Sequence, residues 1–505
     1  MINNNIVIKL FEEINQIPRC SGNEKYISDW LVEYGKKQGW EIYQDDVLNV
    51  VLRVPGRGEL SSGESIIIQG HMDMVGVKEE GSLHDFTKDP IMMFEEDGWL
   101  KAKGTTLGAD NGIAIAIALA IATEKNISHP PLELLFTVDE ERGLTGAREL
   151  KSDVLKGKYL INIDSEDEGV FTIGCAGGRN TLIDIPLVYE ENISKNDCYK
   201  LSISRLSGGH SGIQINENKP NAIKIVTDVV HWITKNTDNF NLCSINAGVA
   251  HNAIPTNATI CFSSKNEPLV KIIKKQTFDE IERDFRAKEP QMELSFEKIE
   301  PCERYIRTDI SQNIIKMLMD LPHGVFSLVN DKQSQKTDPA TQKNVSPELS
   351  SVSQTLEPIG HDEIVETSNN LAQVDTDEDK LRILISLRSS KSSQMDVLYE
   401  KIEDISQMYG ANCYADEGYP AWEPDWESEL LTKSKVSYKN IYGTEPEVEV
   451  IHAGLECGVI GAKYPEMQMI SIGPTIKAPH TPNESLKIKD IDKIISFLLE
   501  LFKNI

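Results

Sequence analysis

Four apolar segments of this sequence each end in side chains that bind metal ions or move protons in proteins. The residues that follow these segments are, in chain order, His71 with Asp73, Glu140 with Glu141, Asp164 and, after a short loop, His480. Asp110 adds a carboxylate in the segment LGADNG, at the predicted start of a helix. Imidazoles and carboxylates without cysteine are typical of catalytic rather than structural zinc sites. A carboxylate that bridges two metals about 3.5–4 Å apart is the usual way in which such a set activates water.

The four segments SIIIQG, LELLFTV, KYLINID and MQMISIG are predicted to be strands of one sheet, because they are apolar along their length. Ligands collect beyond the carboxyl ends of the strands in open α/β sheets, so the four ends are expected to meet. Taken singly, each residue has an ordinary interpretation: Asp110 as a helix cap, the Glu pair as a solvated loop, and each histidine as a core or loop residue. Their common position after strands of one type favours a metal site.

The rest of the chain divides into regions of different character. Residues 1–178 alternate strand and helix patterns, as in βαβ units, and residues 420–505 return to that style. Residues 179–419 contain alternating segments that are typical of an antiparallel sheet, followed by helical stretches. Residues 331–358 are rich in Ser, Gln, Lys and Thr and are predicted to be a disordered insertion. The predicted fold is therefore α/β, with a mixed, mostly parallel sheet flanked by helices and interrupted by an inserted α+β domain.

Composition excludes several classes of partner. The net charge of −27 over 505 residues argues against nucleic acid and anionic membranes, which need clustered Lys and Arg. The eight cysteines are scattered without a CxxC pair, which favours a reducing compartment. The amino-terminal segment lacks the basic and apolar regions of a signal peptide, and the longest apolar run, at 113–122, is far shorter than the ~20 residues of a membrane helix. A cytoplasmic location is expected.

Nine motifs of the sequence resemble, in order, those of the aminoacyl-histidine dipeptidases, which are also called beta-alanyl-histidine dipeptidases or peptidase D. The motifs are QGHMDMV, GTTLGADNGI, TVDEERG, INIDSEDEG, GCAGG, GGHSG, NAIP, IHAGLECG and SIGPTIKAPHTPNE. This group belongs to the di-zinc metallopeptidases that include carnosinases, aminoacylases and glutamate carboxypeptidases. The resemblance covers nearly the whole chain apart from 331–358, and the blocks GADNGI and IHAGLECG are specific to the subgroup.

The resemblance implies two Zn²⁺ ions per chain, with Co²⁺ or Mn²⁺ as substitutes. His71 and Asp164 would hold one ion, Glu141 and His480 the other, and Asp110 would bridge them. The implied activity is hydrolysis of dipeptides, Xaa-His such as beta-Ala-His among them. The binding partner would be a small peptide substrate, and a homodimer is one possible assembly of the chain.

The resemblance also assigns proton-transfer roles. Asp73 would accept a hydrogen bond from the His71 imidazole and fix its tautomer. Glu140 would be the general base that takes a proton from the metal-bridging water and gives it to the leaving amine. Adjacent side chains on extended backbone point apart, which lets Glu141 bind metal while Glu140 faces the water. Bound cations remove the repulsion within the run Asp139–Glu141, where Asp139 is predicted to be solvated.

Further residues are expected to contact the substrate. The resemblance implies that the inserted domain is a lid, from which His210 of GGHSG stabilises the oxyanion. Asn252 and Arg388 would face the substrate from the same lid, with the guanidinium suited to the terminal carboxylate of a dipeptide. The subgroup motif IHAGLECG supplies the last three predicted substrate-binding residues, His452, Gly454 and Glu456.

Alternatives from other classes remain open at this stage. An N-acyl-amino-acid deacylase or an exo-carboxypeptidase shares the metal set and differs in the pocket. A non-catalytic metal-binding scaffold would not need the intact base Glu140. A serine hydrolase is excluded by spacing, since the motif G-x-S-x-G requires a glycine where this chain has Ile213. Cys457 beside His452 has no sign of thiolate activation, and His251 before NAIP is expected to affect side-chain preference only.

Overall fold

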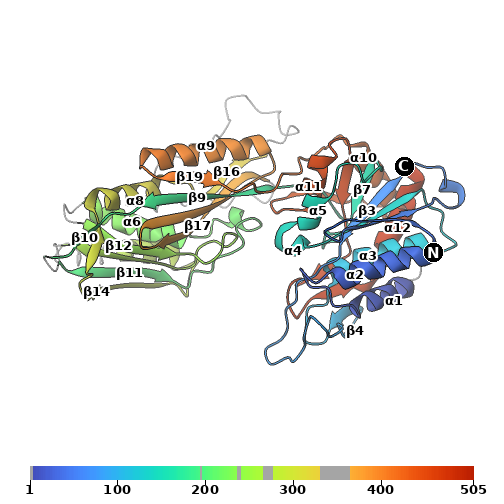
Figure 1. Cartoon of the computed structure of the whole chain (residues 1–505), viewed down its shortest axis with the longest axis horizontal. Helices are drawn as coiled ribbons and strands as arrows, with labels where there is room; N and C mark the ends of the chain where they lie inside the picture. Colours follow the sequence, from blue (N-terminus) through green and yellow to red (C-terminus); the bar gives the residue numbers. More distant parts are fainter. Residues whose placement is uncertain (1–3, 194–195, 236–239, 265–276, 330–363) are drawn as a thin grey trace. The chain divides into compact units, whose positions relative to one another are not determined.

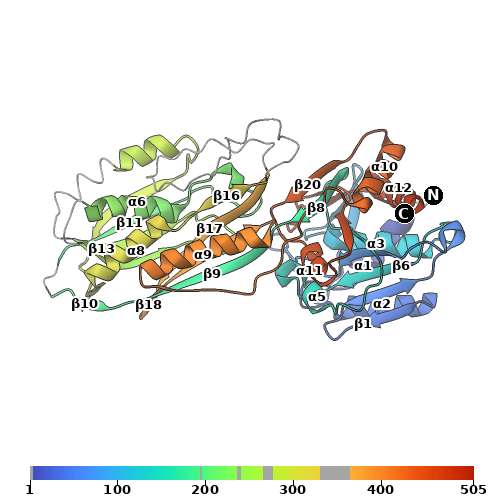
Figure 2. The same cartoon turned by 90° about the horizontal axis from the view of Figure 1, so that it is seen from above.

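The computed structural model describes residues 4–193, 196–235, 240–264, 277–329 and 364–505, so the predicted insertion at 331–358 lies outside the described residues. The chain forms two compact units (Figures 1 and 2). Unit 1 comprises residues 1–175, 422–451 and 455–505, and unit 2 comprises 176–421 and 452–454. The sequence-based boundaries were placed at 178/179 and 419/420. The short segment 452–454 joins unit 2 although the residues on either side belong to unit 1.

Unit 1 is built on an eight-stranded sheet, counted over the described residues. The strands β6, β3, β7 and β21 run parallel to one another at its centre, whereas β1, β2 and β8 pair antiparallel with a neighbour. The mixed α/β fold expected from the sequence is confirmed. The strand bounds, in sheet order, are β1 (Glu41–Gln44), β2 (Val50–Val54), β6 (Leu132–Thr137), β3 (Ile66–His71), β7 (Tyr159–Asn162), β21 (Gln468–Ser471), β8 (Val170–Cys175) and β20 (Glu447–Ile451).

Helices cover this sheet, and α3 (Ala109–Thr123) is the most buried of them. Residues 113–122 of α3 are completely buried, and α3 packs against β3, β6 and the terminal helices α1 (Asn4–Asn15) and α12 (Ile488–Asn504). Alternating Ile and Ala suits this position, because the small alanines allow close approach and alanine favours helix. The other helices are α2 (Lys25–Gln38), α4 (Glu140–Gly143), α5 (Thr145–Glu149), α10 (Glu429–Tyr442) and α11 (Glu456–Lys463).

A small second sheet of unit 1 brings the carboxyl-terminal part of the chain beside the start of α3. Its order is β22 (Ile476–Lys477), β23 (Ser485–Lys487), β5 (Trp99–Ala102) and β4 (Met93–Glu96), with every pair antiparallel. The loop between β22 and β23 carries His480 and Glu484. This pairing fixes the loop close to residues 107–110, which it contacts through hydrogen bonds.

Unit 2 is an antiparallel sheet of nine strands, within the residues that the structure describes. The order is β14 (Glu293–Ile299), β11 (Cys198–Ser204), β13 (Ala258–Ser264), β12 (Phe240–Ala247), β17 (Val365–Thr376), β18 (Lys380–Ser389), β9 (Gly177–Pro186) and β19 (Asn412–Ala415), with β16 (Gly324–Leu328) also paired to β17. A two-stranded ribbon pairs β10 (Tyr189–Glu191) with β15 (Arg304–Ile306).

The core of unit 2 lies between this sheet and the helices α6 (Ala222–Lys235), α8 (Thr308–Asp320) and α9 (Ser392–Met408). Alternate residues of the strands, such as Leu201 and Ile203 of β11, face that core. The eight cysteines of the chain all carry free thiols. None of the helices in the described ranges is both long and apolar enough to cross a membrane.

Candidate active site

The first cluster of candidate residues begins at the carboxyl end of β3. His71 is the last residue of the strand, and its Nδ1 atom lies 3.1 Å from the backbone oxygen and 3.3 Å from Oδ1 of Asp73. The Asp73 carboxylate is completely buried and accepts hydrogen bonds from the hydroxyl of Ser21 and the backbone N–H groups of Glu140 and Glu141. Asp73 therefore connects the end of β3 to the first turn of α4. Its contact with Nδ1 leaves Nε2 of His71 to face the remaining carboxylates.

Asp110 lies in the first turn of α3, where the backbone departs from helical angles. It does not act as the helix cap that its position in the sequence allowed. The cap residue is Gly108, and the carboxylate of Glu484 instead accepts the backbone N–H groups of Leu107, Gly108, Ala109 and Asp110. The Asp110 side chain is free to point at the two histidines, with Oδ1 3.0 Å from His71 Nε2 and Oδ2 3.1 Å from His480 Nε2.

The acidic run after β6 turns sharply into the short helix α4. Asp139 has a left-handed backbone conformation with φ 53°, so the chain changes direction at this residue. Its carboxylate is not simply solvated, as the sequence suggested, because it accepts hydrogen bonds from Arg142 Nε at 2.7 Å and Thr145 Oγ1 at 2.5 Å. Asp139 thus closes the turn that presents Glu140 and Glu141.

Two further strand ends complete the cluster. Asp164 follows β7, and its Oδ1 atom lies 3.4 Å from His71 Nε2. His480, in the loop between β22 and β23, has a left-handed backbone with φ 59°, and its Nε2 atom lies 3.0 Å from Glu141 Oε2. The structure therefore brings together all five residues predicted as metal ligands.

The donor atoms form overlapping triads that share single residues. His71, Asp110 and Asp164 have ligand atoms within 4.8 Å of one another, as do Asp110, Glu141 and His480. Asp110 is common to both triads. A third group joins His71 with Glu140 and Glu141. The donor chemistry, two imidazoles with several carboxylates, fits two metal ions bridged by one carboxylate.

Electrostatics of the cluster also fit bound cations. Burial, with the charges of Asp164 and Glu456, raises the pKa of Glu140 well above its ordinary value. Burial likewise raises the pKa of Asp164 to about 6. Hydrogen bonds that the protonated His480 ring donates to the carboxylates of Asp110 and Glu141 raise its pKa to about 11. Without metal ions, bound protons thus offset the repulsion among the crowded carboxylates. Divalent ions would offset that repulsion more effectively.

Glu456 lies behind this cluster at the start of α11. Its side chain is completely buried, and Oε2 accepts hydrogen bonds from Gln69 Nε2 at 2.5 Å and Thr137 Oγ1 at 2.6 Å. Oε1 has no hydrogen-bond partner among the described residues, and burial raises the pKa of the group to about 7. The contacts join Glu456 to the ends of β3 and β6; its predicted part in substrate binding stays a prediction.

The remaining predicted residues belong to unit 2. His210 Nδ1 accepts the backbone N–H groups of Gly212 at 3.2 Å and Ile213 at 3.1 Å, which leaves the proton of a neutral ring on Nε2. Burial and the charge of Arg388 lower the pKa of His210, so the ring is neutral at physiological pH. Asn252 accepts a hydrogen bond at its backbone oxygen from Ser211, and its side chain is exposed. A neutral imidazole with an Nε2 proton can donate to a developing oxyanion.

Arg388 and His452 lie near His210 within unit 2. Arg388 Nη1 donates to the Tyr419 hydroxyl at 3.0 Å, and His452 Nε2 lies 2.7 Å from Ser368 Oγ. A side chain at Gly212 would approach both the His452 backbone oxygen and Arg388 Nε, so these groups surround that glycine. Gly454 similarly leaves room for the Tyr419 ring, which would contact any added Cβ. The structure brings these residues together in unit 2, and their contacts with substrate stay a prediction.

Two structural residues of the site were not identified from the sequence. Arg19 is completely buried and donates to the backbone oxygens of Met72, Asp73 and Gly108, which ties β3 to the start of α3. Glu484 holds the same turn through its carboxylate. Glu484 lies in the quoted motif SIGPTIKAPHTPNE, so its position in that motif was the available signal. Arg19 lies outside every motif. It donates to backbone oxygens, which every residue has, so the types of its partner residues do not reveal these contacts.

Comparison with known proteins matches this chain to a family and to full-length relatives. The model of the peptidase family M20/M25/M40 matches residues 67–504. The cytosol non-specific dipeptidase of Escherichia coli is 32% identical over 98% of this chain and 96% of its own length. A probable succinyl-diaminopimelate desuccinylase of Staphylococcus aureus is 23% identical over 65% of this chain and 77% of its own length.

Solved structures give the same fold. The aminoacylhistidine dipeptidase of Vibrio alginolyticus has a TM-score of 0.85 at 30% identity, covering 100% of this chain and 97% of the other. The aminopeptidase PepT of Bacillus cereus has a TM-score of 0.54 at 15% identity, covering 100% and 99%, which is a likeness of fold alone.

Proposed function

This chain belongs to the peptidase family M20/M25/M40, and from that premise we propose that it hydrolyses dipeptides with two divalent metal ions. It is a peptide-bond hydrolase of the metallo-dipeptidase type, in keeping with its full-length dipeptidase relatives. The observation that supports the two-metal proposal is the pair of donor triads that share Asp110. Zinc is the ion we assign, because the set combines imidazoles with carboxylates.

The proposed division of ligands gives His71 and Asp164 to one ion and Glu141 and His480 to the other, with Asp110 between them. When bound, the metals would lower the pKa of a water molecule and polarise the scissile carbonyl. Asp73 orients the His71 ring through Nδ1, so that Nε2 carries the lone pair toward the ion. Hydrogen bonds from the backbone of α4 to the same carboxylate hold Glu140 and Glu141 in register.

Glu140 is the general base in this proposal. It shares a triad with His71 and Glu141, yet it takes no part in either triad that contains Asp110. Its carboxylate takes a proton from the attacking water and delivers it to the leaving amine. Burial makes Glu140 a better proton acceptor than an exposed glutamate, because its pKa is raised.

Unit 2 contributes the groups that would bind the substrate. We assign the Nε2 proton of His210 to the oxyanion of the tetrahedral intermediate and the Arg388 guanidinium to the terminal carboxylate of the dipeptide. Arg388 Nη1 donates to the Tyr419 hydroxyl, and its Nε atom has no hydrogen-bond partner among the described residues. Asn252, His452 and Gly454 of unit 2 and Glu456 of unit 1 complete the proposed substrate-binding set.

A substrate panel tests the activity and its nearest rivals. Zinc-loaded protein is incubated with beta-Ala-His, a second unsubstituted dipeptide, a tripeptide and an N-acetyl amino acid, and products are separated by chromatography. We expect turnover of both dipeptides and little of the tripeptide. Cleavage of the N-acetyl compound alone would identify a deacylase instead. Absence of turnover in protein that holds two zinc ions would identify a metal-binding scaffold.

Two properties of the whole protein complete the proposal. We assign it to the cytoplasm, where its free thiols would persist, and a relative carries the name cytosol non-specific dipeptidase. We also propose a homodimer, on the resemblance of the motifs alone. Light scattering coupled to size-exclusion chromatography distinguishes a dimer from a monomer of 56.5 kDa.

A further inference from the structure

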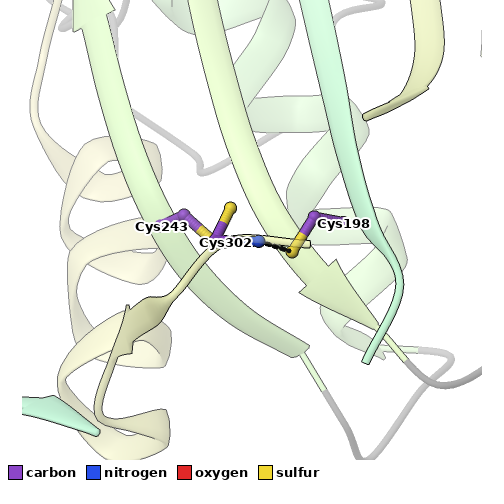
Figure 3. Close-up of side chains that lie close together, drawn as sticks. All are labelled: Cys198, Cys243 and Cys302. Atoms are coloured by element: carbon purple, nitrogen blue, oxygen red, sulfur yellow. Dashed lines mark hydrogen bonds between the residues drawn. The ribbon is translucent and has the colours of Figure 1, made fainter. Parts of the chain in front are cut away.

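Three cysteine thiols of unit 2 gather at a place that the dipeptidase proposal does not use. Cys198 is the first residue of β11, Cys243 lies in β12, and Cys302 lies in the loop between β14 and β15. The sulfur atoms of the three residues lie within 4.8 Å of one another. Figure 3 shows the three side chains close together. We name this group the thiol cluster. All three residues carry free thiols.

An irregularity in β12 helps to build the thiol cluster. Leu242 pairs with Phe262 of β13, but the next paired residues are Ser244 and Cys261, so Cys243 is an extra residue in the strand. Such a bulge bends a strand and redirects the side chain of the extra residue. The strand β13 lies between β11 and β12 in the sheet, so Cys198 and Cys243 are not direct cross-strand neighbours. The sulfur atoms of the two residues nevertheless lie within 4.8 Å of each other.

The loop that carries Cys302 is held in place by its backbone. The Cys302 N–H donates to Cys198 Sγ at 3.0 Å, which Figure 3 marks with a dashed line. Asn192 Nδ2 donates to the Cys302 backbone oxygen at 3.0 Å, and the Asn192 N–H donates to the Glu303 oxygen at 2.8 Å. These contacts fix the third thiol without any bond between sulfur atoms.

A cavity gives small ions a route to the thiol cluster. Its volume is about 490 Å³, and Cys243 and Cys302 line it together with Ser244, Glu303, Asp377 and Glu378. Cys198 is buried and does not line the cavity. Three carboxylates on the lining favour the entry of cations. The Arg304 guanidinium, also on the lining, stacks over the Tyr189 ring with its central carbon 4.1 Å from the ring centre.

We propose that Cys198, Cys243 and Cys302 form a binding site for one thiophilic metal ion, Cu(I) or Zn(II), separate from the dipeptidase site. Thiolates select these ions over the hard cations that carboxylates prefer. Metal–sulfur bonds of about 2.3 Å in a trigonal arrangement place sulfur atoms about 4 Å apart, which lies within the observed spacing. Among the described residues, no histidine, carboxylate or fourth cysteine joins this group. Three ligands suffice for Cu(I), and Zn(II) would add a water molecule from the cavity.

Ion binding would replace the protons that the three sulfur atoms carry at the working pH, and these protons are released to solvent as the thiolates bind the metal. No oxidation is involved, since each sulfur keeps its oxidation state. A disulfide between two of the three cysteines is the competing outcome. It would need an oxidant and would leave the third thiol without a role.

The test uses the full chain, treated with a chelator and fully reduced, under an inert atmosphere. Cu(I) is titrated in competition with the Cu(I) chelator bathocuproine disulfonate, so that the measurement does not depend on the carboxylate site. We expect the natural protein to retain one Cu(I) per chain at chelator concentrations that strip it from Cys302→Ser, a loss of at least tenfold in affinity. Cys413→Ser is the matched control, because Cys413 is a partly buried thiol of unit 2 outside the thiol cluster.

Zinc counting by metal analysis forms the second arm. If Zn(II) is the ion, zinc-saturated natural protein is expected to hold one more zinc ion per chain than zinc-saturated Cys302→Ser. The zinc held by the dipeptidase site is common to both proteins and does not affect this difference. Dipeptidase activity of Cys302→Ser reports on folding and is expected to stay within twofold of normal. If that variant loses activity, Cys243→Ser replaces it, since this side chain also lines the cavity.

Three results would overturn the proposal. One is equal Cu(I) and Zn(II) binding by the natural protein and the cluster variants. Another is binding that Cys413→Ser weakens as much as Cys302→Ser does. The third is a disulfide within the thiol cluster in freshly isolated protein, found by mass spectrometry, combined with no metal uptake after reduction.

Discussion

The carboxylate cluster of unit 1 and the thiol cluster of unit 2 collect metal-binding side chains from different parts of a sheet. In unit 1, most donors follow the carboxyl ends of the parallel strands β3, β6 and β7, while Asp110 lies in the first turn of α3 and His480 in a loop. In unit 2, the donors come from the start of one antiparallel strand, a bulge in another and a loop. Parallel strands all end at one edge, so donors after them meet automatically; antiparallel strands need a local irregularity.

The two clusters also differ in the cost of being metal-free. Carboxylates that are packed together and buried repel one another, so unit 1 depends on protons or cations for neutrality. Thiols are neutral when protonated and pack as small apolar groups. We therefore expect metal removal to affect the carboxylate cluster strongly and the thiol cluster weakly. The predictions below test this difference, from the largest effect to the smallest.

The largest effect is expected from Glu140→Gln, which removes the proposed base and keeps its shape. The turnover number should fall by about 10²–10⁴-fold, the usual contribution of general acid–base catalysis, while two metals stay bound. Glu141→Gln should instead lose the ion shared with His480. Metal analysis and steady-state kinetics measure both effects, and Glu149→Gln, an exposed residue of α5, is the control. Equal metal content in the Glu140 and Glu141 variants would show that the roles are divided wrongly.

A smaller effect is expected from Asp73→Asn, because Asp73 acts on the metal site through His71. Oδ1 of Asp73 faces both the His71 imidazole and the Glu140 N–H, whereas Oδ2 accepts from Glu141 and Ser21. An amide nitrogen in place of either oxygen cannot accept a hydrogen bond, so the substitution removes part of this set. Metal affinity or activity should fall by about 10–100-fold. Titration with a fluorescent zinc chelator measures the affinity, and the exposed Asp46→Asn is the control. Unchanged zinc affinity would show that Asp73 does not position His71 for metal binding.

The sequence predicted the carboxylate cluster because most of its donors occupy an equivalent position after an apolar strand. His71, Asp164, the Glu140–Glu141 pair and His480 are grouped by that rule alone, and Asp110 lies at a predicted helix start beside them. The family motifs add the role of each residue. The mixed α/β fold follows from the same alternation of elements and is confirmed. The assignment of each ligand to one ion stays a prediction.

The remaining features depend on contacts that residue types do not encode. Arg19 and Glu484 position the site by binding backbone atoms, which any sequence possesses. Asp139 was interpreted as solvated because its partner, Thr145, is reached only after the chain turns. The residue pattern does not predict the thiol cluster, because its members are scattered along the chain and the bulge at Cys243 adds one unpaired residue to an ordinary alternating strand.

The smallest effect concerns the stability of metal-free protein as a function of pH. Burial raises the pKa of Asp164 to about 6 and of Glu456 to about 7, above the values of about 4 that these groups have in an unfolded chain. The folded state therefore binds more protons than the unfolded state between pH 4 and 7. Stability from these groups is complete below pH 4 and is lost as the pH rises through 6 and 7.

We expect the unfolding free energy of chelator-treated protein to fall by on the order of a few kcal/mol between pH 5 and 8, and zinc to abolish most of that fall. Urea unfolding at several pH values measures it. Glu456→Gln should flatten the slope, whereas Glu447→Gln, on an exposed part of β20, should not. The thiol cluster contributes with the opposite sign, because hydrogen bonding from Cys243 lowers the pKa of Cys302 to about 6. Cys302→Ser should therefore steepen the fall slightly. A flat profile in the natural metal-free protein would mean that the carboxylates of unit 1 tolerate their crowding without a cation.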